Sequence, residues 1–234
     1  LLNLRRLLAA GVKPDRLIVE VLRPVLGGDA PAEKLFLAPR LSAADLQRVT
    51  PYCQDATPLY VDWAEIRLNP WYHLRLNLLC HWGGGSLLPW QHRQDFMWKQ
   101  MKGRGWLPYF FSEITPEKRA QSTAEAQAQY AGYFVNFHLA ELPDRSYRDL
   151  LELARAEGIR VAFLVMPESA TFRRWYPPGV QPLITDYLQK LSREYDVEFF
   201  DASDWLGDET YYADGHHLMR HGAKLFSERL GRET

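Results

Sequence analysis

Three segments of the chain share one hydrophobic pattern, in which a helix with an apolar stripe is followed by a short turn and a compact apolar run. The apolar runs are RLIVEVL at 16–22, IRVAFLVM at 159–166 and VEFFDA at 197–202. The helices before them are expected over residues 1–10, from an N-cap at Ser146 to Gly158, and around a stripe from Leu183 to Leu191. Short apolar runs bounded by turn signals are typical of strands, and their lack of alternation predicts that both faces are covered.

Alternating helices and strands of this kind predict an α/β fold. We expect a mostly parallel sheet between two layers of helices, which is a three-layer α/β/α sandwich, with a last helix from about Arg220. In such folds, ligands bind at the carboxyl ends of the strands. This rule directs attention to Arg23, to the segment 167–169 and to the segment that follows the third strand.

A long segment, roughly residues 27–145, separates the first unit from the second and is expected to be a helical insertion within a single domain, 1–234. Its helices are expected at 42–49, at 62–82 with an interruption at Pro70, and from the N-cap Thr115 to about residue 139. Five of the eight tryptophans lie here, namely Trp63, Trp71, Trp82, Trp90 and Trp98. Two interpretations stay open, an extra helical layer over the sheet or the wall of a substrate cleft.

Composition excludes some classes of function. The chain has 234 residues, 47% of them hydrophobic, and a net charge of -1. The length suits one domain with a sizeable core. The balanced charge argues against nucleic acid as a partner, because phosphate binding requires a basic surface. No apolar run reaches the length of a membrane span, and the two cysteines do not indicate a disulfide framework.

The stretch YYADGHHLMRHGAKLFSERL at 211–230 gathers titratable residues at the start of the last helix. Asp214 and His217 are three positions apart, and in a tight turn the carboxylate can accept the Nδ1 proton and leave Nε2 free as a base. Such a pair needs only a hydroxyl partner. His216 is expected to be a loop residue. Two alternatives stay open: Asp214 as a simple helix cap, or a metal site of Asp214, His217 and His221.

Three more residues are candidates for substrate binding. Arg23, Glu168 and Arg173 are expected near the carboxyl ends of the strands, where they could bind an acidic group of a substrate. The alternative is a salt-bridged loop. Glu20 lies inside an apolar strand, and because a buried carboxylate needs a partner, Arg23 is a candidate to pair with it.

The segment DGHHLMRHGAKLFSERL, which follows the strand VEFFDA, resembles the last block of the SGNH (GDSL-type) hydrolase superfamily. There an Asp-x-x-His pair completes a Ser-His-Asp triad. GVKPDRLIVEV and GIRVAFLVMPES resemble strands of that fold, and FRRWYPP resembles a phrase of bacterial SGNH-like proteins. The resemblance implies a flavodoxin-like fold, with His217 as base, Asp214 as the orienting carboxylate, and Gly222-Ala223 entering the helix where bulk would crowd the sheet.

The resemblance does not extend to the nucleophile. The family's serine stands on a turn after the first strand, and no Gly-x-Ser segment follows a strand in this chain. The sequence begins inside a helical pattern, so we expect a fragment whose nucleophile lies upstream of Leu1. Ser86, in HWGGGS, follows a helix-like segment and is not expected to be the nucleophile. Leu22-Arg23-Pro24 replaces the family's Gly-x-Asn-Asp turn, which leaves the oxyanion hole unidentified.

The resulting prediction is an SGNH-type serine esterase or acyltransferase that acts on a small acyl ester, with carbohydrate O-acetyl groups as the preferred substrate class. The fragment itself is expected to be inactive. Two alternatives stay open, a non-catalytic carbohydrate-binding or scaffold module and a metal-dependent hydrolase. No cofactor, bound metal or transmembrane segment is expected, and the resemblance implies the bacterial cell envelope or periplasm.

Overall fold

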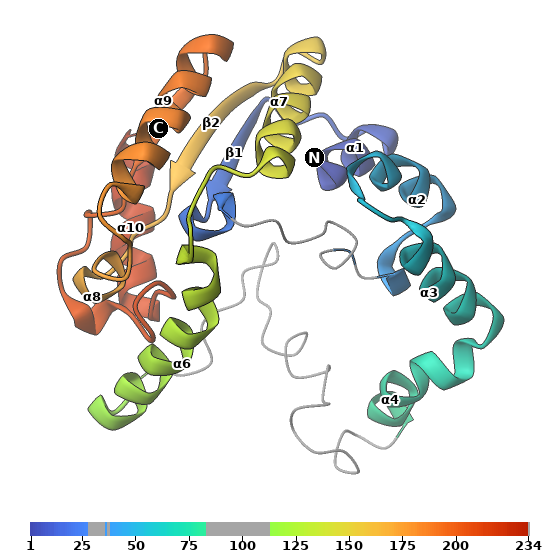
Figure 1. Cartoon of the computed structure of the whole chain (residues 1–234), viewed down its shortest axis with the longest axis horizontal. Coiled ribbons are helices and arrows are strands. Elements are labelled where there is room, and N and C mark those ends of the chain that lie inside the picture. The colour runs from blue at the N-terminus through green and yellow to red at the C-terminus, as the bar shows by residue number, and fades with distance from the viewer. Residues whose placement is uncertain (28–35, 37, 83–112, 234) are drawn as a thin grey trace. The chain divides into compact units, whose positions relative to one another are not determined.

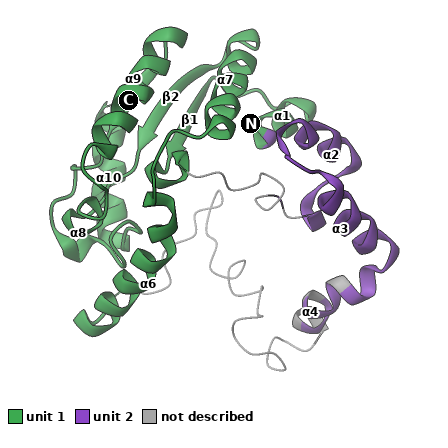
Figure 2. Cartoon of the chain, viewed as in Figure 1, with its two compact units in different colours: residues 1, 3–29, 109–234 green, residues 2, 30–108 purple. Residues whose placement is uncertain are grey.

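The computed structural model describes residues 1–27, 36, 38–82 and 113–233 (Figure 1). The expectations for Ser86, Trp90 and Trp98 lie outside the described residues. The chain divides into two compact units, which are coloured separately in Figure 2. Unit 1 comprises residues 1, 3–29 and 109–234, and unit 2 comprises residues 2 and 30–108.

Unit 1 is a mixed α/β structure, as the sequence predicts. Its helices are α1 (Leu2–Ala9), α6 (Pro116–Phe134), α7 (Glu141–Ala156), α8 (Ala170–Arg173), α9 (Val180–Tyr195) and α10 (Arg220–Glu233). Its strands are β1 (Arg16–Val21), β2 (Arg160–Val165) and β3 (Glu198–Asp201), and its short 3-10 helices are η1 (Arg23–Leu26) and η6 (Glu209–Tyr211). The three strands form a parallel sheet in the order β1-β2-β3, with Leu17 opposite Val161 and Phe163 opposite Phe199.

Strand β2 is covered by helices on both faces. Phe163 belongs to a core that includes Leu151 of α7 and Ile184 of α9, whereas Leu164, on the other face, packs in a cluster with Phe226 of α10. Two-sided burial was also expected for β1, and that prediction is wrong, because Ile18 on the second face is 42% exposed. The cluster that contains α10 covers the β2 and β3 side of this face and leaves the edge strand open.

The start of one helix differs from the sequence-based expectation. The N-cap of α7 is Ala140, and the predicted cap Ser146 lies inside the helix. Pro143 falls in the first turn, where a missing amide hydrogen costs no helical hydrogen bond, so the helix can start before it. The N-cap of α6 is Thr115, as predicted, and its hydroxyl accepts from the Lys118 amide at 3.3 Å.

The described part of unit 2 consists of helices joined by short loops: η3 (Ala38–Arg40), α2 (Ala43–Val49), η4 (Thr50–Tyr52), α3 (Thr57–Leu68) and α4 (Pro70–Trp82). Ser42 and Asp45 cap α2 reciprocally, because each side chain accepts from the other residue's amide. Trp63 donates its indole hydrogen to the Leu41 carbonyl at 2.9 Å and packs in the small core of this unit, whereas Trp71 is exposed. Helix α6, which was expected within the insertion, belongs to unit 1.

Across the described residues, no helix has both the length and the apolar character that a bilayer crossing requires.

Candidate active site

The three strands end at one edge of the sheet, where charged side chains meet. Arg23, just after β1, donates to Asp201 at the end of β3 (2.6 Å), to Glu168 after β2 (3.3 Å) and to the Ser203 hydroxyl (3.3 Å). Tyr176 donates its hydroxyl to the second carboxylate oxygen of Glu168 at 2.7 Å. One guanidinium therefore links the ends of all three strands.

This network lies inside the protein. The side chains of Arg23 and Glu168 are 3% and 5% exposed. Burial raises the pKa of Glu168, although the Arg23 charge and the Tyr176 hydrogen bond oppose the shift. Arg173 donates to the carbonyls of Glu168 and Ser203, both at 2.6 Å. The structure thus brings together the three residues expected to bind substrate, but their polar groups are directed to one another and to the backbone.

Glu20 is not the partner of Arg23. It lies opposite Leu164 in the register of β1 and β2, on the face of the sheet that is open at β1. The pairing expected from sequence is therefore replaced by the pairing of Arg23 with Glu168 and Asp201. Arg23 stands beyond the end of the strand, where it reaches the carboxylates that follow the neighbouring strands.

The segment 211–219 forms a closed loop between η6 and α10. Tyr212 and Leu218 form an antiparallel bridge. The Ala213 amide donates to the His217 carbonyl at 2.8 Å, and the Met219 amide donates to the Tyr211 carbonyl at 2.8 Å. These hydrogen bonds hold the two sides of the loop together at its base. The residues from Asp214 to His217 form the turn at its tip.

Gly215 allows this loop to pack on the segment after β2. Its φ of 103° lies in a region that favours glycine, and a Cβ there would come within 3.3 Å of the Phe172 Cβ. The Ser169 amide donates to the Gly215 carbonyl at 2.8 Å, while the Ser169 hydroxyl accepts from the Phe172 amide and caps α8. The segment PES at 167–169 therefore supports the loop that carries the two neighbouring histidines.

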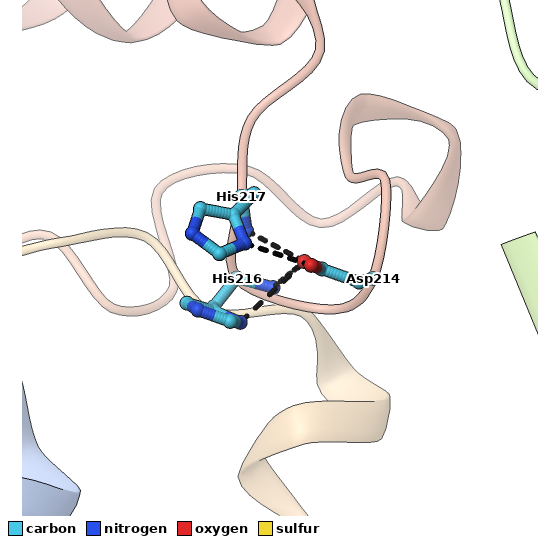
Figure 3. Close-up of side chains that lie close together, drawn as sticks. All are labelled: Asp214, His216 and His217. Atoms are coloured by element: carbon cyan, nitrogen blue, oxygen red, sulfur yellow. Dashed lines mark hydrogen bonds and ion pairs between the residues drawn. The ribbon is translucent and has the colours of Figure 1, made fainter. Parts of the chain in front are cut away.

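Asp214 and His217 are in direct contact at the tip of the loop (Figure 3). The His217 Nδ1 lies 2.7 Å from Asp214 Oδ2, and the His217 amide donates to Asp214 Oδ1 at 3.0 Å. The Asp214 side chain is 13% exposed and that of His217 is 57% exposed. A largely buried carboxylate thus holds an imidazole that is more than half exposed.

The electrostatics of the pair fit this geometry. Burial alone would raise the pKa of Asp214, but the hydrogen bonds from His217 and the nearby imidazoles outweigh it and bring the pKa below its usual value. The hydrogen bond to Asp214 in turn raises the pKa of His217. At neutral pH the carboxylate is charged, so it accepts the Nδ1 hydrogen and leaves Nε2 as the basic nitrogen of neutral His217.

His216 and Tyr130 belong to the same site, and the sequence analysis did not identify either of them as functional. The Tyr130 hydroxyl, from α6, lies 3.0 Å from His216 Nε2, and the His216 and His217 ring centroids are 3.9 Å apart. Burial, followed by repulsion from His217, lowers the pKa of His216 to about 4. In the sequence, Tyr130 follows Ala126 at helical spacing, and both are buried. That spacing indicates a packed helix face, but it does not identify His216 as the partner of Tyr130.

One described group of side chains is close enough to hold a metal ion. The ligand atoms of Asp214, His216 and His217 all lie within 4.8 Å of one another. His221, which the metal alternative placed beside Asp214 and His217, packs against the Tyr211 ring with centroids 5.4 Å apart. Asp214 Oδ2 and His217 Nδ1 form the 2.7 Å hydrogen bond, so an ion bound to these two atoms would have to replace it.

Gly222 marks a close approach, but its neighbour is not the sheet. A Cβ at this position would stand 2.7 Å from the Tyr211 carbonyl oxygen. The first turn of α10 is thus pressed against η6, which sets where the helix leaves the loop. The sequence analysis expected a larger side chain at Gly222 to crowd the sheet. That expectation is wrong, because the side chain would crowd Tyr211 of η6 instead.

No protein-family model matches this sequence, and no curated protein matches it. The chemistry of the site must therefore be argued from its own geometry. At the carboxyl edge of this parallel sheet, a buried carboxylate orients a half-exposed imidazole. An imidazole held in this way can accept a proton from a hydroxyl group and return it to a leaving group.

Proposed function

We propose that the chain carries the acid-base half of a serine esterase or acyltransferase, with His217 as general base and Asp214 as its orienting carboxylate. The observation that carries the proposal is the 2.7 Å contact between His217 Nδ1 and Asp214 Oδ2, with His217 exposed and Asp214 buried. A carboxylate used only as a helix cap would have no need of the imidazole. The resemblance of DGHHL to the SGNH superfamily supports the same roles and the flavodoxin-like fold.

The reaction follows from the basic nitrogen of His217, Nε2. Nε2 accepts the proton of a serine hydroxyl as its oxygen attacks the ester carbonyl carbon, and Asp214 stabilises the imidazolium that forms. When the tetrahedral intermediate collapses, the carbon–oxygen bond to the leaving alcohol breaks and His217 gives that alcohol its proton. A second nucleophile then attacks the acyl-enzyme in the same way. This nucleophile is water in a hydrolase and an acceptor hydroxyl in a transferase.

The substrate class is a small acyl ester, and carbohydrate O-acetyl groups are preferred because of the resemblance. Arg23 and Glu168 contribute nothing to binding an acidic group in this proposal, since each is buried and neutralised by the other. The half-exposed face of His217 is the place where the ester would approach.

The proposal is tested with the protein expressed from its complete gene. Hydrolysis of p-nitrophenyl acetate should fall by at least about a thousandfold in His217→Ala, while His221→Asn, an exposed neighbour, should retain wild-type rates. A fluorophosphonate probe followed by peptide mass spectrometry should locate the nucleophilic serine. Equal rates for wild type and His217→Ala would reject the assignment, and a protein without labelling would favour a non-catalytic carbohydrate-binding module.

A second candidate function is a metal-dependent hydrolase, and the closeness of Asp214, His216 and His217 favours it. Two imidazoles and a carboxylate are the ligands of many catalytic zinc sites, in which an open position holds the attacking water. The two candidates make opposite predictions for chelator treatment. Activity that survives dialysis against a chelator and responds to the fluorophosphonate supports the serine reaction, whereas activity lost with the chelator and restored by Zn²⁺ supports the metal.

A further inference from the structure

The side chain of His216 lies between α6 and Asp214. Its Nε2 is 3.0 Å from the Tyr130 hydroxyl, and its Nδ1 is 3.4 Å from Asp214 Oδ1. The ring is 11% exposed. It stands edge-on to the Tyr130 ring at 5.1 Å and is tilted against Phe172, also at 5.1 Å. These contacts leave His216 little freedom to turn.

Tyr130 is itself held firmly. The residue is 6% exposed and belongs to the main core of unit 1, and its ring packs edge-on against Phe172 with centroids 5.4 Å apart. The hydroxyl therefore has a defined position, set by α6 rather than by the loop. A hydroxyl placed this way at the end of a packed aromatic ring gives the loop a hydrogen-bonding partner in a fixed position.

The hydrogen-bond network selects one tautomer of His216. If the Tyr130 hydroxyl donates to Nε2, the ring hydrogen sits on Nδ1 and faces Asp214 Oδ1. The 3.4 Å separation is long for a hydrogen bond, and the buried Nδ1 atom has no other partner, so this contact acts mainly through charge. The opposite tautomer would turn a nitrogen lone pair toward the carboxylate, which is repulsive.

We propose that Tyr130 and His216 form a positioning pair that holds the Asp214 carboxylate, and through it the His217 ring, in the orientation required of the base. One imidazole approaches each carboxylate oxygen, His217 at Oδ2 and His216 at Oδ1. Rotation of the carboxylate would break both contacts together. The His216 ring, 3.9 Å from the His217 ring, also restricts the tilt of the base. His216 thus acts through its neighbours, and the inference rests on the proposed function.

Two variants separate this role from packing. Tyr130→Phe keeps the ring and removes only the hydroxyl, and His216→Phe keeps a ring between Tyr130 and His217 but removes both nitrogens. Tyr133→Phe is the matched control, because Tyr133 lies on the same helix with its ring 6.1 Å from that of Tyr130. Thermal melting monitored by circular dichroism verifies that each variant folds, and His216→Phe serves if Tyr130→Phe does not.

The first readout is spectroscopic and needs no activity. A His217 Nδ1 hydrogen bonded to a carboxylate should give a far-downfield proton resonance, identified by its loss in Asp214→Asn. It should shift or broaden in Tyr130→Phe and His216→Phe and stay in place in Tyr133→Phe. The second readout is esterase kinetics of the complete protein, in which Tyr130→Phe should lower kcat about tenfold with KM changed less than about twofold.

The outcomes distinguish this inference from the proposed reaction. A wild-type protein without esterase activity, whose resonance still moves in Tyr130→Phe, would refute the reaction and leave the positioning pair standing. A resonance and a kcat that are both unchanged in Tyr130→Phe and His216→Phe would overturn the positioning pair, whatever the activity of the wild type.

Discussion

Arg23 and Glu168 are 145 positions apart in the sequence, and their side chains meet at 3.3 Å inside the protein. The same guanidinium reaches Asp201 at 2.6 Å. These contacts join the segments that follow β1 and β2 to the end of β3, at the edge of the sheet where the loop 211–219 is supported. The stability of this edge is therefore a condition for the geometry of the site.

Replacement of Arg23 by methionine should destabilise the protein strongly. Methionine fills much of the same space but leaves Glu168 buried without its cation, and removing one partner of a buried ion pair costs about 3 kcal/mol or more. The free energy of unfolding from urea titration, followed by tryptophan fluorescence, measures the change. Lys224→Ala, which removes an exposed pair with Glu228, should change it by less than about 0.5 kcal/mol. Similar effects of the two substitutions would contradict a structural role for Arg23.

Helix α10 contains two glycines that should respond to alanine in opposite ways. At Gly222 a Cβ would lie 2.7 Å from the Tyr211 carbonyl oxygen, so Gly222→Ala should destabilise the protein by about 2 kcal/mol. At Gly231 nothing lies within 4 Å, so Gly231→Ala should be neutral or stabilise by up to about 1 kcal/mol. Thermal unfolding of the two variants provides the comparison. A Gly222→Ala protein as stable as Gly231→Ala would show that α10 does not approach η6 this closely.

Local patterns in the sequence were sufficient for most elements of unit 1. The runs at 16–22, 159–166 and 197–202 correspond to β1, β2 and β3, because apolar runs between helices have few other solutions. The start of α7 was misplaced because Ser146 and Asp149 resemble a capping pair, whereas Pro143 is the residue that fits the first turn. Local signals compete at helix ends, and the tertiary packing decides between them.

The site was predictable only as far as its residues are close in sequence. Asp214 and His217 are three positions apart, so a tight turn suffices to bring them together. The contact of Tyr130 with His216 joins positions 86 apart, and no local pattern encodes it. The choice of His216 over His221 as the neighbour of Asp214 depends on where the loop ends and α10 begins, which the contact of Gly222 with Tyr211 determines.

Stability should depend on pH through His216. Its pKa is lowered to about 4 by burial and by repulsion from His217, whereas an unfolded histidine titrates near about 6.5. Between these values the unfolded chain binds a proton at His216 that the folded chain does not, so stability decreases as the pH falls. The loss at this residue should be about 2 kcal/mol between about pH 6.5 and 5.

The difference between the urea unfolding curves of wild type and His216→Phe isolates this contribution, since other groups titrate in both proteins. The wild type should lose more stability than His216→Phe as the pH falls. His217 acts in another pH window, because its raised pKa gives stabilisation that is present below about pH 6.5 and lost as the pH rises through the folded-state value. Parallel curves for the two proteins below pH 6.5 would contradict the burial of a neutral His216.

Asp214→Asn should reduce esterase turnover far more than it reduces the stability of the folded protein. Asparagine can still accept the His217 amide hydrogen through its side-chain oxygen, so the turn is retained. It cannot stabilise the imidazolium as a carboxylate does, and kcat should fall by about a thousandfold or more.

The pH profile of esterase activity should also move in Asp214→Asn. In the wild type, activity rises with pH as His217 loses its proton at a pKa above the usual histidine value, because the bond to Asp214 favours the charged form. Without the carboxylate this limb should shift to lower pH. An unchanged limb in the Asp214→Asn profile would mean that the group controlling activity is not the imidazole that Asp214 holds.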